Sequence, residues 1–201
     1  MKHLKLKICG IKNDTDVNAV NLTQPDYAGF VFAPSRRKVD FETAKILREQ
    51  IDKKIVTVGV FVNAPVDEIA LLVESGIISV VQLHGEENFD FLSRLKKITG
   101  VPIIQAIKEN TAAVIHRNSD FLLFDSKNPG SGEIFDRSTI NPAGKPWFLA
   151  GGLTPENIAE ALIQTRRLNP CGIDISSGVE TDGDKDIKKI TLIKEIIKKC
   201  L

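Results

Sequence analysis

The stretch IVTVGVFVNAPVDEIALLVESGIISVVQLH (residues 55–84) decides the fold. It begins with a nearly continuous apolar, β-branched run at 55–62 and ends with a second such run at 78–84. Between them, segment 64–76 has Pro65 near its start and Gly76 at its end, which is typical of a helix. Continuous apolar strands are typical of a parallel sheet that is covered on both faces. The stretch therefore predicts a strand–helix–strand unit.

The same unit recurs along the whole chain. Further strands are expected at 4–9, 27–32, 101–107, 120–125, 146–151 and 172–176. Further helices are expected at 41–51 behind an Asp40 cap, at 86–100, at 154–167 behind a Thr154 cap, and at 185–201. Strands repeated at this spacing predict an α/β protein, a compact (β/α)8 TIM barrel in which residues 1–201 form a single domain. Segment 126–144 reads mostly as loop, so the sixth helix is expected to be short or irregular.

Composition excludes several classes of protein. The formal net charge is +1, which argues against a nucleic-acid partner bound through a general electrostatic surface. No apolar run approaches the roughly 18 residues of a membrane span, and the N-terminal run is too short for a signal peptide. The three cysteines lack the close spacing of a metal or redox motif, so we expect free thiols, no metal and a cytoplasmic location.

A parallel barrel carries its active site at the C-terminal ends of its strands. Cys9, His84, Asp125 and Asp174 all fall at such ends. Position alone leaves Cys9 open between a small buried hydrophobe and a functional thiol. It likewise leaves Asp125 open between a group that fixes a loop and a proton donor whose pKa is raised by burial. A thiol and a carboxylic acid from the first and sixth strands would suit a base and an acid acting on one small substrate.

Two glycine-containing turns predict a phosphate site. AGGLTPEN (150–157) and ISSGVE (175–180) follow the seventh and eighth expected strands. The loops after those two strands commonly bind phosphate in this fold, and glycine lets a backbone approach an anion closely. Each turn alone would be a weak signal, but together they favour a phosphorylated ligand.

Seven segments resemble the signature segments of the phosphoribosylanthranilate isomerase family of tryptophan biosynthesis. In chain order they are KICGI, GFVFAPSRRKV, VGVFVN, VQLHG, DSKNPGSG, LAGGLTPEN and GIDISSGVE. They cover nearly the whole chain, with one segment at most strand ends. The sequence departs from the family pattern in the sixth loop, at Pro129 and Arg137.

The resemblance implies roles for individual residues. Cys9 would be the general base and Asp125 the general acid. Arg37 would bind the anthranilate carboxylate, with Arg36 as the alternative. Backbone N–H groups of Gly151, Gly152, Ser177 and Gly178 would hold the phosphate, while His84 and Asp174 would contact ribose hydroxyls or order the base. We also expect a lowered pKa for Cys9, helped by a positive group such as Lys7.

The implied reaction is the Amadori rearrangement of N-(5-phosphoribosyl)anthranilate to 1-(o-carboxyphenylamino)-1-deoxyribulose 5-phosphate. Its partner is a small phosphoribosyl molecule, and no cofactor is required because the substrate nitrogen serves as the electron sink. The family occurs as monomers and homodimers, and the sequence does not separate these. Two rival interpretations are a metal-dependent phosphosugar epimerase, which three scattered histidines fit poorly, and a barrel that binds without catalysis.

Overall fold

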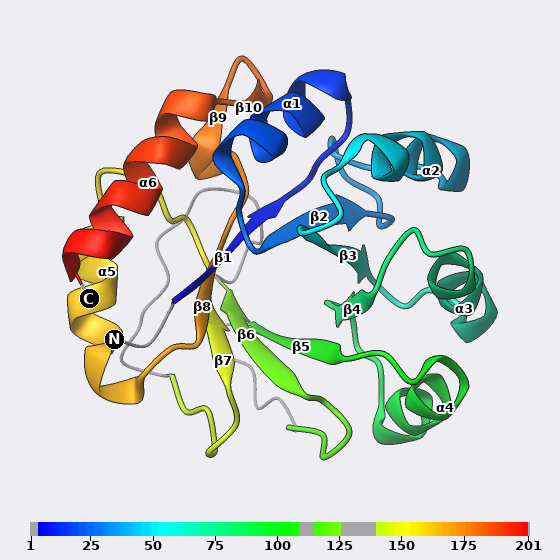
Figure 1. Ribbon diagram of the computed structural model, residues 1–201. Coiled ribbons are helices and arrows are strands. Elements are labelled where there is room, and N and C mark those ends of the chain that lie inside the picture. Colours follow the sequence, from blue (N-terminus) through cyan, green and yellow to red (C-terminus); the bar gives the residue numbers. More distant parts are fainter. Residues whose placement is uncertain (1–3, 109–114, 126–139, 201) are drawn as a thin grey trace.

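Eight parallel strands close into a barrel, as the sequence predicts. The computed structural model describes residues 4–108, 115–125 and 140–200. Each strand pairs with its neighbours in chain order, and β1 pairs with β8 to close the ring (Figure 1). The strands are β1 (Lys5–Cys9), β2 (Tyr27–Val31), β3 (Val56–Phe61), β4 (Val80–Leu83), β5 (Ile103–Lys108), β6 (Phe121–Asp125), β7 (Trp147–Leu149) and β8 (Gly172–Ile175). The (β/α)8 fold class is thereby confirmed.

Helices surround the strands in the described part of the chain (Figure 1). They are α1 (Asp14–Thr23), α2 (Phe41–Gln50), α3 (Val66–Glu74), α4 (Phe89–Thr99), α5 (Ile158–Thr165) and α6 (Ile187–Cys200). The Asp40 cap of α2 is confirmed, since its side chain accepts a hydrogen bond from the Thr43 amide at 2.8 Å. The expected short sixth helix falls on residues 126–139, outside the described residues, and the single-domain assignment stays a prediction.

One helix was not expected from the sequence, and two others begin later than expected. Helix α1 was not among the expected helices, because its polar sequence carries only a weak apolar stripe. Helix α4 begins at Phe89 behind an Asn88 cap, three residues later than expected. Helix α5 begins at Ile158 and not at Thr154, so the proposed Thr154 cap is wrong. Residues 155–157 form a turn before α5, and residues 86–88 have no regular structure before α4.

Two apolar layers hold the barrel together. The larger layer packs the outer faces of the strands against the helices. A smaller cluster contains residues from six of the strands and fills the barrel interior: Tyr27, Val58, Val80, Ile104, Leu123, Phe148 and Ala150. Because side chains alternate across a strand, the inward-pointing residues on the C-terminal side of this cluster project into the mouth of the barrel. The cluster therefore closes the inner end of any cavity at the mouth.

A small antiparallel hairpin follows β8 and was not predicted. Strands β9 (Glu180–Thr181) and β10 (Asp184–Lys185) are joined by Asp182 and Gly183, which have φ angles of 53° and 90°. Asp-Gly is a favoured two-residue turn of this kind, so the sequence contained the signal. The buried Asp16 carboxylate of α1 accepts the Lys185 amide at 2.7 Å, which fixes the hairpin against the first unit of the barrel.

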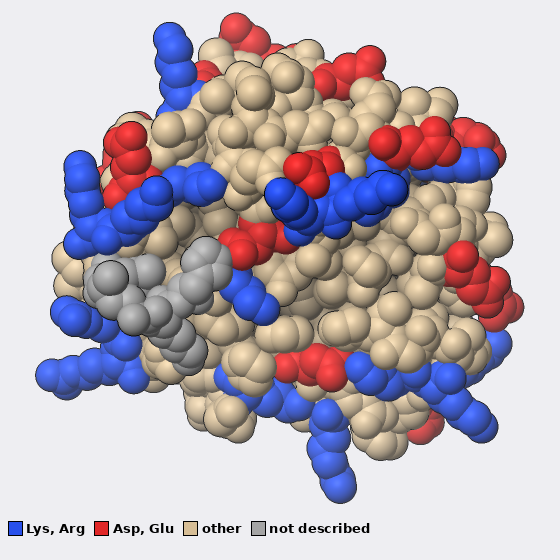
Figure 2. All heavy atoms as spheres, in the orientation of Figure 1, with Lys and Arg blue, Asp and Glu red and all other residues tan. Residues whose placement is uncertain are grey.

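The surface seen along the barrel axis carries charges of both signs. Lysine and arginine side chains project around the rim, with acidic side chains between them (Figure 2). This mixture agrees with the net charge of +1. Among the described residues, no helix has both the length and the apolar character needed to span a membrane.

Candidate active site

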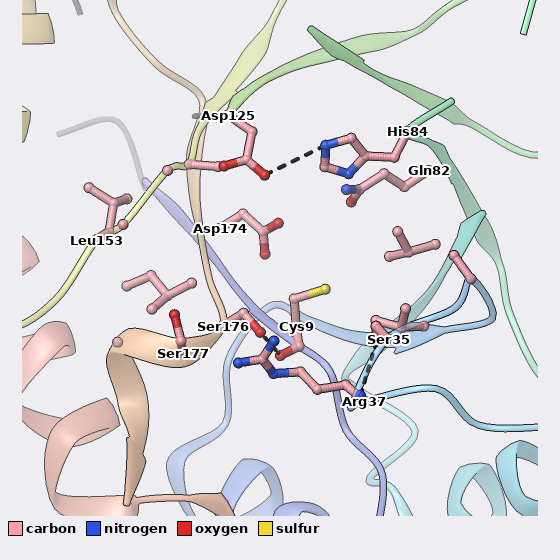
Figure 3. A pocket seen from close by; sticks show the side chains of 18 of the residues that line it. Cys9, Ser35, Arg37, Gln82, His84, Asp125, Leu153, Asp174, Ser176 and Ser177 are labelled. Carbon is pink, nitrogen blue, oxygen red and sulfur yellow. Dashed lines mark hydrogen bonds and ion pairs between the residues drawn. The ribbon is translucent and has the colours of Figure 1, made fainter. Parts of the chain in front are cut away.

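A cavity of about 280 Å³ opens at the C-terminal mouth of the barrel, near the lower end of the size range for ligand sites. Apolar side chains such as Val31, Val60 and Leu153 form much of its wall. Every site residue predicted from the sequence lines it: Cys9, Arg37, His84, Asp125, Gly151, Gly152, Asp174, Ser177 and Gly178. Polar groups from β1, β4, β6 and β8 thus converge on one enclosed space (Figure 3).

Cys9 ends β1 with its thiol at the cavity. The residue is 8% exposed and forms no disulfide, as expected. Its backbone carbonyl accepts a hydrogen bond from the Ser176 hydroxyl at 3.0 Å, which ties the end of β1 to the end of β8. Burial raises the pKa of Cys9 despite the nearby Lys7 ammonium. The expected lowering of this pKa is therefore wrong, because desolvation outweighs the attraction of the neighbouring charge.

Asp125 and His84 face one another on another side of the cavity. His84 Nε2 lies 3.6 Å from Asp125 Oδ2, and both side chains are nearly buried (Figure 3). The imidazole therefore lies within ion-pair distance of the Asp125 carboxyl group. The expected role of His84, to contact ribose or to order the base, stays a prediction, and the contact with Asp125 is additional to it.

Asp174 is paired inside the barrel with a residue that was not counted among the site residues. Both of its carboxylate oxygens accept hydrogen bonds from Lys7 Nζ at 2.9 Å. Lys7 is completely buried, and strand register places it directly beside Asp174. Burial alone would lower the pKa of Lys7, but Asp174 and Cys9 together raise it above its ordinary value. Lys7 is therefore a cation.

Arg37 and not Arg36 lines the cavity. Arg37 is 7% exposed, whereas the Arg36 side chain is 65% exposed. Arg37 donates from Nε and Nη2 to the Glu180 carboxylate at 2.6 and 2.9 Å. Lys185 Nζ donates to the same carboxylate at 2.7 Å. The β9–β10 hairpin thus orients Arg37, a function that sequence reasoning missed because Glu180 is distant from Arg37 along the chain.

Glu180 is ionised throughout the physiological range. Burial opposes its ionisation, but the Arg37 hydrogen bonds and the Lys185 charge outweigh burial and lower the pKa of Glu180 from 4.5 to about 2. A lowered folded-state pKa stabilises the fold fully above the unfolded-state value. This stabilisation is lost as the pH falls from about 4.5 to about 2.

Replacing Glu180 by glutamine is expected to destabilise the protein in a pH-dependent way. At pH 7 the variant leaves Arg37 and Lys185 without their anion, so its free energy of unfolding should fall below that of the parent. The difference should shrink as the pH is lowered toward 2, where the parent carboxylate is also neutral. Urea unfolding across this range measures it, with the exposed Glu195→Gln as control. A difference that stays constant with pH would contradict the assignment.

The two glycine turns pack against each other at the mouth. A Cβ on Gly178 would overlap the carbonyl oxygen of Leu153, so only glycine allows the turn after β8 to meet the turn after β7. The Asn157 side chain braces the latter turn, since it donates to the Gly152 carbonyl at 2.8 Å and accepts from the Thr154 amide at 2.9 Å. Sequence reasoning assigned no role to Asn157, although an Asn before a helix commonly has one.

Comparison with known proteins identifies the family. A family model described as N-(5'phosphoribosyl)anthranilate (PRA) isomerase matches residues 6–196. The chain belongs to the PRA isomerase family. This confirms the resemblance seen in the seven sequence segments, and it makes the protein an enzyme of tryptophan biosynthesis.

This chain matches individual PRA isomerases over nearly their full length. The N-(5'-phosphoribosyl)anthranilate isomerase of Endomicrobium trichonymphae is 45% identical over 199 residues, covering 96% of this chain and 98% of that protein. A structure of monomers of the dimeric enzyme from Thermotoga maritima has a TM-score of 0.83 and 31% identity, covering 98% of this chain and 100% of that one. A further structure of a phosphoribosyl anthranilate isomerase was solved in complex with reduced 1-(o-carboxyphenylamino)-1-deoxyribulose 5-phosphate. It has a TM-score of 0.79 and 30% identity, with the same coverage.

Gln82 is a further cavity residue in this PRA isomerase that sequence reasoning did not select. It lies two positions before His84, so both side chains project from the same face of the β4 segment. Gln82 is 2% exposed, and its buried Oε1 has no hydrogen-bond partner among the residues that the structure describes. A buried amide oxygen without a partner is costly, and a ligand donor would satisfy it. The isolated polar residue in the apolar run VVQL was the available signal.

Proposed function

We propose that this PRA isomerase rearranges N-(5-phosphoribosyl)anthranilate with Cys9 as general base and Asp125 as general acid. The observation that carries the proposal is the shared cavity: a thiol from β1, a carboxyl group from β6 and the two glycine turns line the same space. A small substrate held by its phosphate at the turns would present its ribose between the thiol and the carboxyl group. Acid–base catalysis on both sides of one sugar requires this arrangement.

Asp125 acts in the first step of the proposed reaction. Its protonated carboxyl group donates to the furanose ring oxygen, the bond between that oxygen and C1 breaks, and the substrate nitrogen forms an iminium with C1. Donation requires a protonated carboxyl group, and the nearly buried position of Asp125 disfavours a charged carboxylate. The leaving oxygen becomes a hydroxyl group.

Cys9 acts in the second step. Its thiolate removes the proton from C2, the electron pair moves to the iminium, and the resulting enolamine tautomerises to the ketone. A buried thiol with a raised pKa is a poor base on its own, because little of it is ionised. The iminium supplies a positive charge close to the sulfur at the moment when the thiolate is needed, and this charge favours ionisation. The step requires no metal or cofactor, because the substrate nitrogen accepts the electron pair.

The remaining cavity residues would hold the substrate. Arg37 has N–H groups beyond those bonded to Glu180, and a planar guanidinium suits the anthranilate carboxylate. Backbone N–H groups of Gly151, Gly152, Ser177 and Gly178 would bind the phosphate. The buried Gln82 oxygen would accept a hydrogen bond from a substrate O–H or N–H group. Asp174 would contact a ribose hydroxyl or order the base.

Gly178→Ala tests the phosphate turns. The added Cβ would overlap the Leu153 carbonyl and separate the two turns, so hydrogen bonds to a charged phosphate would be lost. We expect KM to rise about tenfold or more with a smaller change in kcat. Inorganic phosphate should inhibit the parent competitively and the variant much less, while anthranilate inhibition should be unchanged. Equal inhibition of both proteins by phosphate would place the phosphate elsewhere.

A steady-state assay tests the proposed function as a whole. The purified protein should consume phosphoribosylanthranilate, seen as loss of anthranilate-type fluorescence, without added metal. A metal-dependent epimerase would require a divalent cation, and a non-catalytic barrel would bind a product analogue without turnover. Assembly as a monomer or a homodimer stays a prediction, and sedimentation of the assayed sample would decide it.

A further inference from the structure

The barrel interior holds a cation that the reaction described above does not use directly. Lys7 is 0% exposed, and its ammonium donates to both carboxylate oxygens of Asp174 at 2.9 Å. Taking a lysine out of water is costly, and an apolar pair of similar volume would often be at least as stable. A buried ion pair beside a reactive group is therefore a candidate for a role in the chemistry.

The geometry of β1 brings this cation to the thiol. Lys7 and Cys9 are two residues apart on one strand, so both side chains project to the inside of the barrel. Gly29 of β2 is the register partner of Cys9. A Cβ on Gly29 would lie 2.9 Å from Cys9 Sγ and 3.3 Å from Lys7 Nζ. The sulfur and the ammonium therefore both border the small space that the missing side chain leaves open.

We propose that Lys7 is a positioning residue for the Cys9 thiolate: Asp174 anchors its ammonium, and Gly29 leaves the space in which the ammonium and the sulfur approach each other. The inference rests on the proposed role of Cys9 as the base. Lys7 keeps its proton throughout and supplies only charge, so it need not touch the substrate. The proton that Cys9 loses leaves through the open cavity to water.

Other charged groups near Cys9 determine the sign of the expected effect. Burial raises the pKa of Cys9, Lys7 lowers it, Asp174 of β8 raises it, and Lys185 of β10 lowers it. Arg37, His84 and Asp125 face the same cavity from the loop after β2, from the end of β4 and from β6. Lys185 donates hydrogen bonds to Glu180 and to the Ser176 carbonyl. Lys7, in contrast, lies two residues from Cys9 on the same strand. Removing Lys7 removes an attraction and exposes Cys9 to the charge of Asp174.

The pH dependence of Cys9 alkylation tests the inference. Iodoacetamide reacts with the thiolate, and the mass of the Cys9 peptide separates this reaction from that of Cys171 and Cys200. In Lys7→Met the rate at neutral pH should fall about tenfold or more, with the half-maximal rate moved to higher pH. The double variant Lys7→Met/Asp174→Asn should show a smaller shift in the same direction, because it also removes the opposing charge.

Two further variants keep the test decisive. Gly29→Ala retains both charges but fills the shared space, so its alkylation should also slow if it forces Sγ and Nζ apart. Lys96→Met breaks a half-buried ion pair with Asp120 outside the cavity and should leave the Cys9 profile unchanged. A folded Lys7→Met variant with the parent alkylation profile overturns the role of Lys7.

Steady-state kinetics distinguish this proposal from the proposed function. Lys7→Met should lower kcat with little change in KM, and raising the pH should restore part of the lost rate. An active Cys9→Ala variant would instead overturn the assignment of the base, whatever the alkylation experiment shows. The two proposals therefore fail on separate measurements.

Discussion

Cys9→Ala is expected to abolish most of the isomerase activity, with kcat lowered by about 10²–10⁴-fold. The alanine side chain has nearly the same volume as the thiol side chain, and the deletion sits at a cavity wall, so the fold should tolerate it. No other described residue at the β1 end of the cavity offers a group that could remove the C2 proton, because Lys7 is a cation paired with Asp174. Affinity for a product analogue should change little, since binding rests on Arg37 and the glycine turns.

Cys171→Ala is the matched control for this experiment. Cys171 is also a free cysteine, but it precedes β8 at the opposite end of the barrel and does not line the cavity. Its replacement should leave kcat within about twofold of the parent, as is typical of substitutions away from the site. Full activity in Cys9→Ala, measured by fluorescence loss with saturating substrate, would remove the thiol from the mechanism.

Asp125→Asn is expected to have the second large effect, again about 10²–10⁴-fold on kcat. Asparagine has the shape of the acid and stays near His84, but its amide does not protonate the ring oxygen. Ring opening then depends on water. Because asparagine keeps the shape of the side chain, KM should change less than kcat.

The surface variant Asp67→Asn serves as control for Asp125→Asn. The Asp67 side chain is 84% exposed in a pair with Arg94 on the barrel exterior, and such pairs contribute little to stability. We expect parent kinetics from it. A parent-like kcat in Asp125→Asn would remove this carboxyl group from the mechanism and would leave His84 as the nearest alternative acid.

Topology accounts for how much of this site the sequence predicts. The eight strands are apolar runs whose spacing is set by the repeated unit, so their order places Cys9, His84, Asp125 and Asp174 at one mouth without any knowledge of contacts. The glycine turns follow the same logic. The family resemblance then gives each residue a role, which position alone left open for Cys9 and Asp125.

Long-range contacts account for what the sequence did not predict. The pKa of Cys9 depends on how completely the folded barrel removes water, a quantity that no local pattern encodes. The partner of Arg37 lies in a hairpin beyond β8, and the buried Asp16 that secures this hairpin belongs to the unpredicted helix α1. Helix α1 itself has only a weak apolar stripe, yet it buries Val17, Ala19 and Val20 in the main core.

The raised pKa of Cys9 has a consequence for the lifetime of the protein. Oxidants and electrophiles attack thiolates far faster than thiols, and the burial that raises the pKa of Cys9 disfavours its thiolate. The positive charge of the iminium would favour the nucleophilic form mainly during turnover. The burial that weakens the resting base therefore also protects it from irreversible damage between turnovers.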